Sequence, residues 1–187
     1  MRIISGTFKG RKILDPKDLK TRPLKDLTKE SIFNVIDHSN KFEIIIQKST
    51  ILDVFSGVGS FGIECLSRGA VSVTFVENYK EALGVLKKNL LTLKLNNYKI
   101  IEKNAYDQIT LNELNKKFDL IFLDPPYKDR DIEIFLKNIQ SESLLKKNGI
   151  IVLHRHKDTK DSFPPGFKIL EEKNYGISRV IFLSCLH

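Results

Sequence analysis

The sequence predicts an α/β fold: a doubly wound, mostly parallel seven-stranded sheet that ends in an antiparallel hairpin, preceded by a small N-terminal β-hairpin extension. From residue 50 onward, short apolar runs alternate with amphipathic helical segments, which is typical of parallel strands buried on both faces. At the C-terminus two strand-like runs follow each other with no helix between them, which indicates an antiparallel pair. With 187 residues and 41% hydrophobic composition, the chain can bury one core.

The N-terminal segment is basic and interrupted by turn-forming residues. Residues 2–14, RIISGTFKGRKIL, contain two short strand-like runs around glycines. Residues 15–23, DPKDLKTRP, are polar and bounded by proline, so we expect a linker there. A helix should follow to His38, with Asp26 as its N-cap and an apolar face on one side.

The elements of the main domain then alternate regularly. Strands are expected at residues 50–55 (TILDVF), 71–77 (VSVTFVE), 98–104 (YKIIEKN), 118–124 (FDLIFLD) and 149–154 (GIIVLH). Helices are expected at residues 59–69, closed by Gly69, at 79–95 and at 130–145, and residues 167–185 form the closing hairpin. We therefore divide the chain into a basic extension, residues 1–39, and a main domain, residues 40–187.

Charge and hydropathy limit the classes of function. The net charge is +8, and residues 1–29 hold +6 of it, with nine Lys or Arg and three Asp. Such a segment is either a solvated, lysine-rich surface or an electrostatic footprint for nucleic acid, and charge alone leaves both open. Apolar runs are too short to cross a bilayer and no secretory signal is evident, so we expect a cytoplasmic protein without membrane contact. Cys65 and Cys185 are expected to be buried free thiols.

A glycine-rich loop follows the first strand of the main domain. Residues 57–62, GVGSFG, match G-x-G-x-x-G between a strand and a helix, and Glu77 ends the next strand 20 residues after the first glycine. Glycines let a ligand approach the backbone, the helix N-terminus offers free N–H groups, and the acid accepts hydrogen bonds from ribose hydroxyls. The loop predicts a nucleoside-bearing cofactor, either NAD or S-adenosylmethionine. Asp53 favours the second, because its carboxylate suits an ammonium and a sulfonium but not a pyrophosphate.

The fourth strand runs directly into Asp124, Pro125, Pro126 and Tyr127. Proline cannot continue a paired central strand. The strand must therefore end at the sheet edge where open α/β sheets bind ligands.

This turn has the groups needed to methylate an exocyclic amine of a nucleobase. The Asp124 carboxylate and the Pro125 carbonyl offer two acceptors for the two N–H bonds of the amine, which lets its nitrogen pyramidalise toward a methyl donor. The prolines hold the carbonyl in place before the substrate arrives. Tyr127 offers a face on which an extruded base can stack. Asp124 acts mainly as a hydrogen-bond acceptor that orients the amine, and only secondarily as the acceptor of its proton. The reaction needs neither a metal nor a covalent intermediate.

The loop DVFSGVG followed by DPPY resembles the class I S-adenosylmethionine-dependent amino-methyltransferases, which act on adenine N6, cytosine N4 or guanine N2 in DNA and RNA. The runs MRIISGTFKGRKI, TRPLKDLTKESIFNVI, LSRGAVSVTFVE and YGISRVIFL narrow this to a resemblance to the RsmD family, which methylates a guanine N2 in bacterial 16S ribosomal RNA. The resemblance extends over essentially the whole chain. It implies a Rossmann-like class I methyltransferase fold.

Carried over by position, the resemblance also implies site residues and partners. The implied cofactor site comprises Asp53, Phe55, Gly57, Gly59, Glu77 and Asn78, with Asn104 and Ala105 beside the adenine. The implied catalytic residues are Asp124, Pro125, Pro126 and Tyr127. The implied RNA-facing residues are Arg2, Lys9, Arg11, Lys12 and Arg22. The cofactor would be S-adenosylmethionine, and the partner 16S rRNA or a small-subunit assembly particle, bound by a monomer.

Three other functions remain as alternatives. An adenine-N6 methyltransferase shares DPPY, although DNA enzymes generally carry a recognition domain for which this chain has no room. A NAD-dependent oxidoreductase explains the glycine loop but neither DPPY nor the basic N-terminus. A non-catalytic ribosome-assembly factor would not need both sites. His154 and His156 lack a third metal ligand in the sequence, so we expect them on the surface or facing RNA, with no metal bound.

Overall fold

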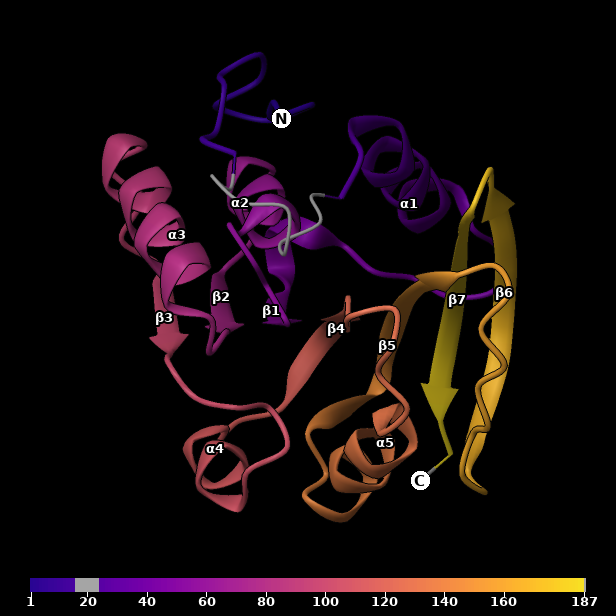
Figure 1. Ribbon diagram of the computed structural model, residues 1–187. Helices are drawn as coiled ribbons and strands as arrows, with labels where there is room; N and C mark the ends of the chain where they lie inside the picture. The colour runs from indigo at the N-terminus through magenta and orange to yellow at the C-terminus, as the bar shows by residue number, and fades with distance from the viewer. Residues whose placement is uncertain (16–23, 187) are drawn as a thin grey trace.

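The computed structural model of the protein describes residues 1–15 and 24–186. A seven-stranded sheet forms its centre, with helices on both faces, and the predicted fold class is confirmed (Figure 1). Most of the predicted linker, Arg22 included, lies outside the described residues.

The elements follow the predicted order, with additions. The strands are β1 (Thr50–Val54), β2 (Ser72–Val76), β3 (Tyr98–Ile101), β4 (Phe118–Leu123), β5 (Leu145–His156), β6 (Phe167–Tyr175) and β7 (Ser178–Cys185). The helices are α1 (Asp26–His38), α2 (Ser60–Ser67), α3 (Lys80–Thr92), α4 (Gln108–Glu113) and α5 (Ile132–Ser141), with a 3-10 turn η1 (Ile46–Lys48) before β1.

The strand order is β3-β2-β1-β4-β5-β7-β6. Strands β1 to β5 are parallel, and β7 pairs antiparallel with both β5 and β6. At the centre, Val54 on β1 lies opposite Val76 on β2 and Leu123 on β4. The chain moves outward from β1 to β3 and then returns to β4 on the other side of β1. The carboxyl ends of β1 and β4 therefore form the switch point at which such sheets bind ligands.

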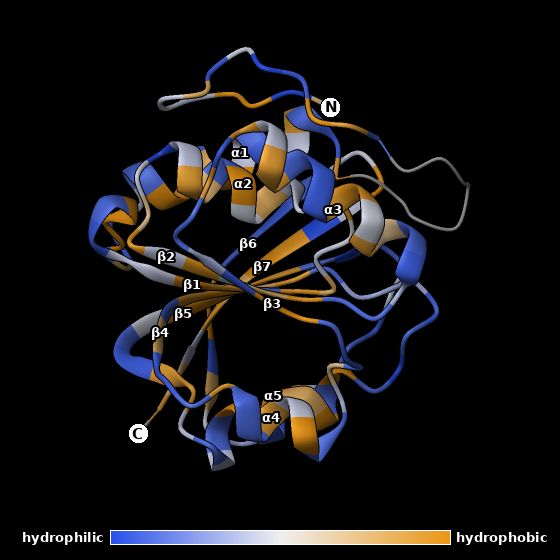
Figure 2. Cartoon of the chain, turned by 90° about the vertical axis from the view of Figure 1, so that its left-hand side faces the viewer, coloured by the Kyte–Doolittle hydropathy of each residue, from blue (hydrophilic) through white to orange (hydrophobic). Residues whose placement is uncertain are grey.

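Two hydrophobic layers cover the sheet. Helices α1, α2 and α3 lie over one face, and α4 and α5 lie over the other (Figure 2). In the first layer three phenylalanine rings stack in a row: Phe33 lies 5.1 Å from Phe61, which lies 3.9 Å from Phe122. These rings fix the start of α2 against β4, next to the switch point.

The N-terminal segment differs from the predicted pair of strands. It is a hairpin-like turn whose two arms pair through backbone hydrogen bonds, from Ile3 N–H to the Arg11 carbonyl and from Ile13 N–H to the Met1 carbonyl, with an isolated antiparallel bridge between Arg2 and Lys12 in place of regular strands. Ile3 and Ile13 are buried in the first hydrophobic layer. Its position beside α2 (Figure 1) is fixed by hydrogen bonds, because the backbone N–H groups of Ile4 and Ser5 donate to the Glu64 carboxylate at 2.8 and 2.9 Å.

Several boundaries also differ from the prediction. The N-cap of α1 is Lys25, for which the structure describes no side-chain capping hydrogen bond, so the predicted cap, Asp26, lies in the first turn instead. Helix α4 and the turn η1 were not predicted, because each is too short to show a periodic pattern. Strand β5 begins at Leu145, where the α5 prediction ended, and its pairing with β4 shifts register between Phe118 and Leu120. The predicted closure of α2 by Gly69 is confirmed, since Gly69 has φ 93° and donates to the Leu66 carbonyl.

Cys65 and Cys185 are both buried free thiols. Within the described residues, each helix is too short or too polar to span a membrane.

Candidate active site

A cavity of about 430 Å³ opens at the carboxyl ends of β1, β2 and β4, a size suited to a nucleoside-bearing ligand. It brings together most of the residues that the sequence predicted for the cofactor and the catalytic turn: Asp53, Phe55, Gly57, Glu77, Asn78, Asp124, Pro125, Pro126 and Tyr127. The lining also includes Leu24, the first described residue after the linker, and His154 on β5. Gly57 of the glycine loop and Asp124 of the DPPY turn are 67 positions apart in the sequence, yet they line the same cavity.

Three predicted residues do not line this cavity. Gly59 is the N-cap of α2 with φ 84°, a left-handed conformation that favours glycine, and a Cβ on it would lie 2.4 Å from the Cδ1 of Leu86, so the local backbone accounts for glycine there. Asn104 is exposed and its side-chain oxygen accepts the backbone N–H of Tyr106 at 3.2 Å. Ala105 is buried in the second hydrophobic layer. Their roles toward an adenine stay predictions.

Glu77 is fixed by the backbone that surrounds it. One carboxylate oxygen accepts the N–H of Gly57 at 2.7 Å, and the other accepts the N–H groups of Asn78 and Tyr79 at 2.9 Å each. The acid thus joins the glycine loop after β1 to the start of α3. Because it already has backbone partners, its orientation is set before any ligand arrives.

Asp53 is a buried carboxylate in the centre of the sheet. Its side chain accepts the N–H of Gly62 at 2.9 Å, and the residue is only 1% exposed. Burial raises its pKa well above the ordinary value, and the nearby charges of Asp124 and Glu77 raise this pKa further. Glu77 and Asp124, joined by Asp53 when it is ionised, line one cavity, which favours a cationic ligand and disfavours a pyrophosphate.

Phe55 holds a strained backbone conformation at the end of β1. Its φ is 57°, in the left-handed region that a bulky side chain rarely adopts. Its ring contacts those of Tyr106 and Phe135 at centroid distances of 5.7 and 6.3 Å. This packing maintains a conformation that costs about 1–3 kcal/mol. Such strain is typical of functional sites, and it turns the chain sharply from β1 into the glycine loop.

The turn after β4 extends the sheet by one hydrogen bond and then leaves it. The Asp124 N–H donates to the Val54 carbonyl at 3.3 Å, which places the start of the turn directly beside the end of β1. The Pro126 carbonyl accepts the N–H of Asp129 at 2.8 Å, which closes the turn. The half-buried Tyr127 ring lies 5.0 Å from the His156 ring in an edge-on arrangement.

Two residues at the end of β5 contact the turn after β4 and were not predicted as site residues. The expectation that His154 lies on the surface is wrong, because it is 4% exposed and its Nδ1 lies 2.8 Å from Asp124 Oδ1. That it faces RNA stays a prediction. The neighbouring Arg155 is 1% exposed and donates to the carbonyls of Asp129 at 2.7 Å and Pro126 at 3.4 Å. The available signal was two basic residues in succession, at the end of an apolar strand that neighbours DPPY.

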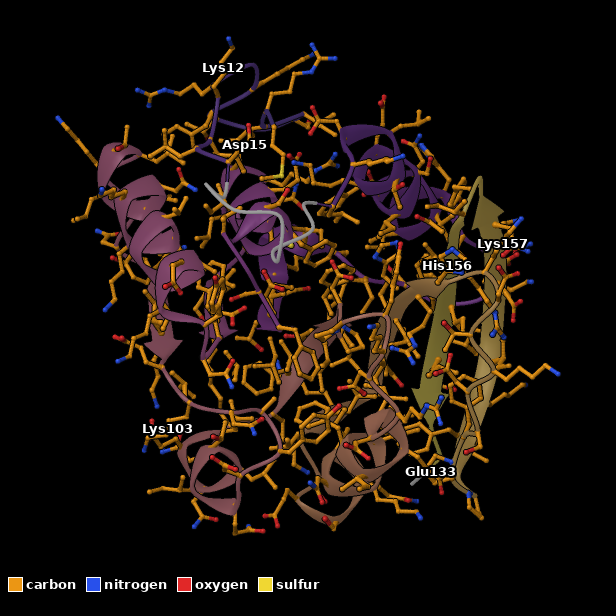
Figure 3. The ribbon with its side chains drawn as sticks, viewed as in Figure 1. Lys12, Asp15, Lys103, Glu133, His156 and Lys157 are labelled. Carbon is orange, nitrogen blue, oxygen red and sulfur yellow. The ribbon has the colours of Figure 1, made fainter. Side chains whose placement is uncertain are left out.

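The basic residues of the N-terminal segment are exposed. Arg2, Lys9, Arg11 and Lys12 all face solvent, and Figure 3 shows Lys12 at the outer edge of the molecule. Their exposure leaves the charges accessible to a polyanion. In residues 1–15 and 24–186, no group of three or more His, Cys, Asp or Glu side chains is arranged to hold a metal ion.

Known proteins resemble this chain over nearly its full length. A family model described as Conserved hypothetical protein 95 matches residues 1–184. The chain is 35% identical over 179 residues to the Ribosomal RNA small subunit methyltransferase D of Haemophilus influenzae, covering 95% of this chain and 90% of that relative. It is 34% identical over 174 residues to the protein of the same name from Buchnera aphidicola, covering 92% and 85%. A solved structure, "Putative methyltransferase yhhF" from Escherichia coli, matches with a TM-score of 0.83 and 25% identity over 100% of this chain and 98% of that one.

Proposed function

The chain belongs to the RsmD family of small-subunit ribosomal RNA methyltransferases, and from this premise we propose that it transfers a methyl group from S-adenosylmethionine to the exocyclic N2 of a guanine in 16S rRNA. The observation that carries the proposal is the shared cavity of the glycine loop and the Asp124 turn. A cofactor held by the loop and a base held by the turn would meet in that space.

The cavity residues fit S-adenosylmethionine. The buried Asp53 carboxylate and its acidic neighbours suit a ligand that carries positive charge, and Glu77 at the end of β2 is placed to accept ribose hydroxyls. When bound there, the cofactor supplies an electrophilic methyl group. NAD fits less well, because its pyrophosphate would lie among the same carboxylates.

The residues of the turn orient the base. The carboxylate of Asp124 accepts one N–H of the guanine amine and the carbonyl of Pro125 accepts the other, which holds the nitrogen for attack. The ring of Tyr127 stacks on the extruded base. After transfer, the proton that the amine loses goes to Asp124 or to water.

The N-terminal segment binds the phosphate backbone of the RNA. Arg2, Lys9, Arg11 and Lys12 neutralise phosphates, and we propose the same role for Arg22, which lies outside the described residues. We propose that the protein acts in the cytoplasm, as a monomer, on 16S rRNA or on a small-subunit assembly particle.

Methyl transfer with labelled S-adenosylmethionine tests the proposal. Naked 16S rRNA and assembled small subunits are offered separately, and the modified nucleoside is identified after digestion. We expect N2-methylguanosine with one of the two substrates. Labelled N6-methyladenosine would favour an adenine methyltransferase instead. No transfer to either substrate, with tight RNA binding, would favour a non-catalytic assembly factor.

A further inference from the structure

We propose that His154 is a positioning residue for Asp124: as a neutral imidazole it donates its Nδ1–H to one carboxylate oxygen and leaves the other oxygen for the base amine. The inference deepens the proposed function and rests on it, because it concerns how the acceptor for the amine is oriented.

The sheet places these two side chains next to each other. Leu123 on β4 is in register with Leu153 on β5, so the residues that follow them, Asp124 and His154, continue the two strands side by side. The Nδ1 of His154 lies 2.8 Å from the Oδ1 of Asp124, and the two side chains are 5% and 20% exposed. His154 is also paired with Val180 on β7, so its backbone lies inside the sheet rather than in a loop.

The surroundings of the second ring nitrogen select the protonation state. The Nε2 of His154 is buried and has no hydrogen-bond partner among the residues that the structure describes. An imidazolium, or the tautomer with the proton on Nε2, would leave a buried N–H donor unsatisfied, which is costly. The tautomer protonated on Nδ1 leaves only the lone pair of Nε2 without a hydrogen-bond donor. A neutral His154 that donates to a charged Asp124 therefore fits the site best.

This hydrogen bond fixes the plane of the carboxylate. A carboxylate at a strand end that is 20% exposed can otherwise rotate and bind water. With Oδ1 bound to His154, Oδ2 remains as the carboxylate oxygen that accepts one N–H of the amine, beside the carbonyl of Pro125. Because His154 acts through Asp124, its loss should slow the chemical step and leave cofactor and RNA binding intact. Misplacement by about 1 Å can lower a rate by roughly 100-fold.

Three substitutions separate this role from simple packing. His154→Ala removes the donor and should lower kcat by about 10- to 100-fold with an unchanged KM for RNA. His154→Asn places an amide N–H2 close to the position of Nδ1 and should restore most of the rate. His154→Gln extends its amide toward the position of Nε2 and should not. His38→Gln, at the exposed end of α1, is the matched control and should equal the unsubstituted protein.

A spectroscopic measurement on the protein without cofactor or RNA gives an independent readout. A long-range ¹H–¹⁵N correlation spectrum at neutral pH should contain one histidine in the neutral Nδ1–H tautomer, and its signals should vanish in His154→Gln. An Nε2–H tautomer or an imidazolium at His154 would overturn the proposal, as would equal rates for all three variants and the unsubstituted protein. Absence of methyl transfer by the unsubstituted protein would instead contradict the proposed function, while the tautomer measurement would still decide the position of the proton.

Discussion

At the scale of single residues, Asp53 illustrates a conflict between stability and binding. Burial raises its pKa well above the usual value, so the folded protein holds a proton that the unfolded chain releases. Stability therefore falls as the pH rises from the unfolded pKa toward the folded one. Above the folded pKa the buried charge of Asp53 destabilises the fold, and a cationic ligand would stabilise that same charged form.

Asp53→Asn should separate these effects. The amide oxygen can still accept the Gly62 N–H, but the buried charge is lost. We expect an unchanged or higher melting temperature at neutral pH. We also expect weaker binding of S-adenosylmethionine, by roughly tenfold or more, as for loss of a hydrogen bond to a charged group. Calorimetry measures both, with Glu30→Gln on the exposed side of α1 as control. Unchanged cofactor affinity would argue against a role of Asp53 in binding.

At the scale of elements, the end of β5 holds the turn that follows β4. Arg155 reaches the carbonyls of Pro126 and Asp129 and also pairs with Asp161 at 2.9 Å. The side chains of this pair are only 1% and 2% exposed. The arginine thus fixes the far end of the turn, while His154 contacts its first residue.

Arg155→Met should destabilise the protein by about 3–5 kcal/mol, because it leaves the buried Asp161 carboxylate without its closest cation. Urea unfolding measures the change. The double variant Arg155→Met, Asp161→Leu removes both charges and should recover most of the lost stability. A single variant as stable as the unsubstituted protein would show that the pair does not hold the turn.

Some residues of this site could be predicted from the sequence, and others could not. Asp124, Gly57 and Glu77 stand in local motifs, so their place at strand ends follows from the order of elements. His154 and Arg155 carry no motif, and their function depends on the register between β4 and β5 and on the pairing of β5 with β7. The N-terminal segment was predicted as two strands because its contacts, too, are with residues far away in the sequence. The turn glycines were evident, but its contacts with Glu64 on α2 join residues some 60 positions apart.

At the scale of the whole molecule, positive charge is concentrated on the N-terminal segment, whereas the cavity proposed to hold the cofactor is lined by acidic residues. These two regions should therefore respond differently to salt. Replacing Arg2, Lys9, Arg11 and Lys12 with glutamine should weaken RNA binding. It should also reduce the slope of log K against log salt concentration by about 0.7 for each phosphate that is no longer neutralised. Cofactor affinity should not change.

A second set of four lysines provides the matched control for this measurement. These exposed residues lie near the amino-terminal ends of the parallel strands or of β6, at the opposite edge of the sheet from the cavity: Lys94, Lys117, Lys147 and Lys168. Replacing them with glutamine removes the same charge. If both sets reduce RNA affinity and its salt slope equally, the N-terminal segment contributes only general charge.

Asp124 joins the cavity, the DPPY turn and His154, so the proposed methyl transfer depends on it. The most direct test is a single-turnover measurement of methyl transfer to 16S rRNA by Asp124→Ala, together with its affinity for S-adenosylmethionine. We predict that transfer is lost while cofactor affinity stays close to that of the unsubstituted protein. Transfer at the unsubstituted rate would contradict the assignment of the turn as the site that orients the amine.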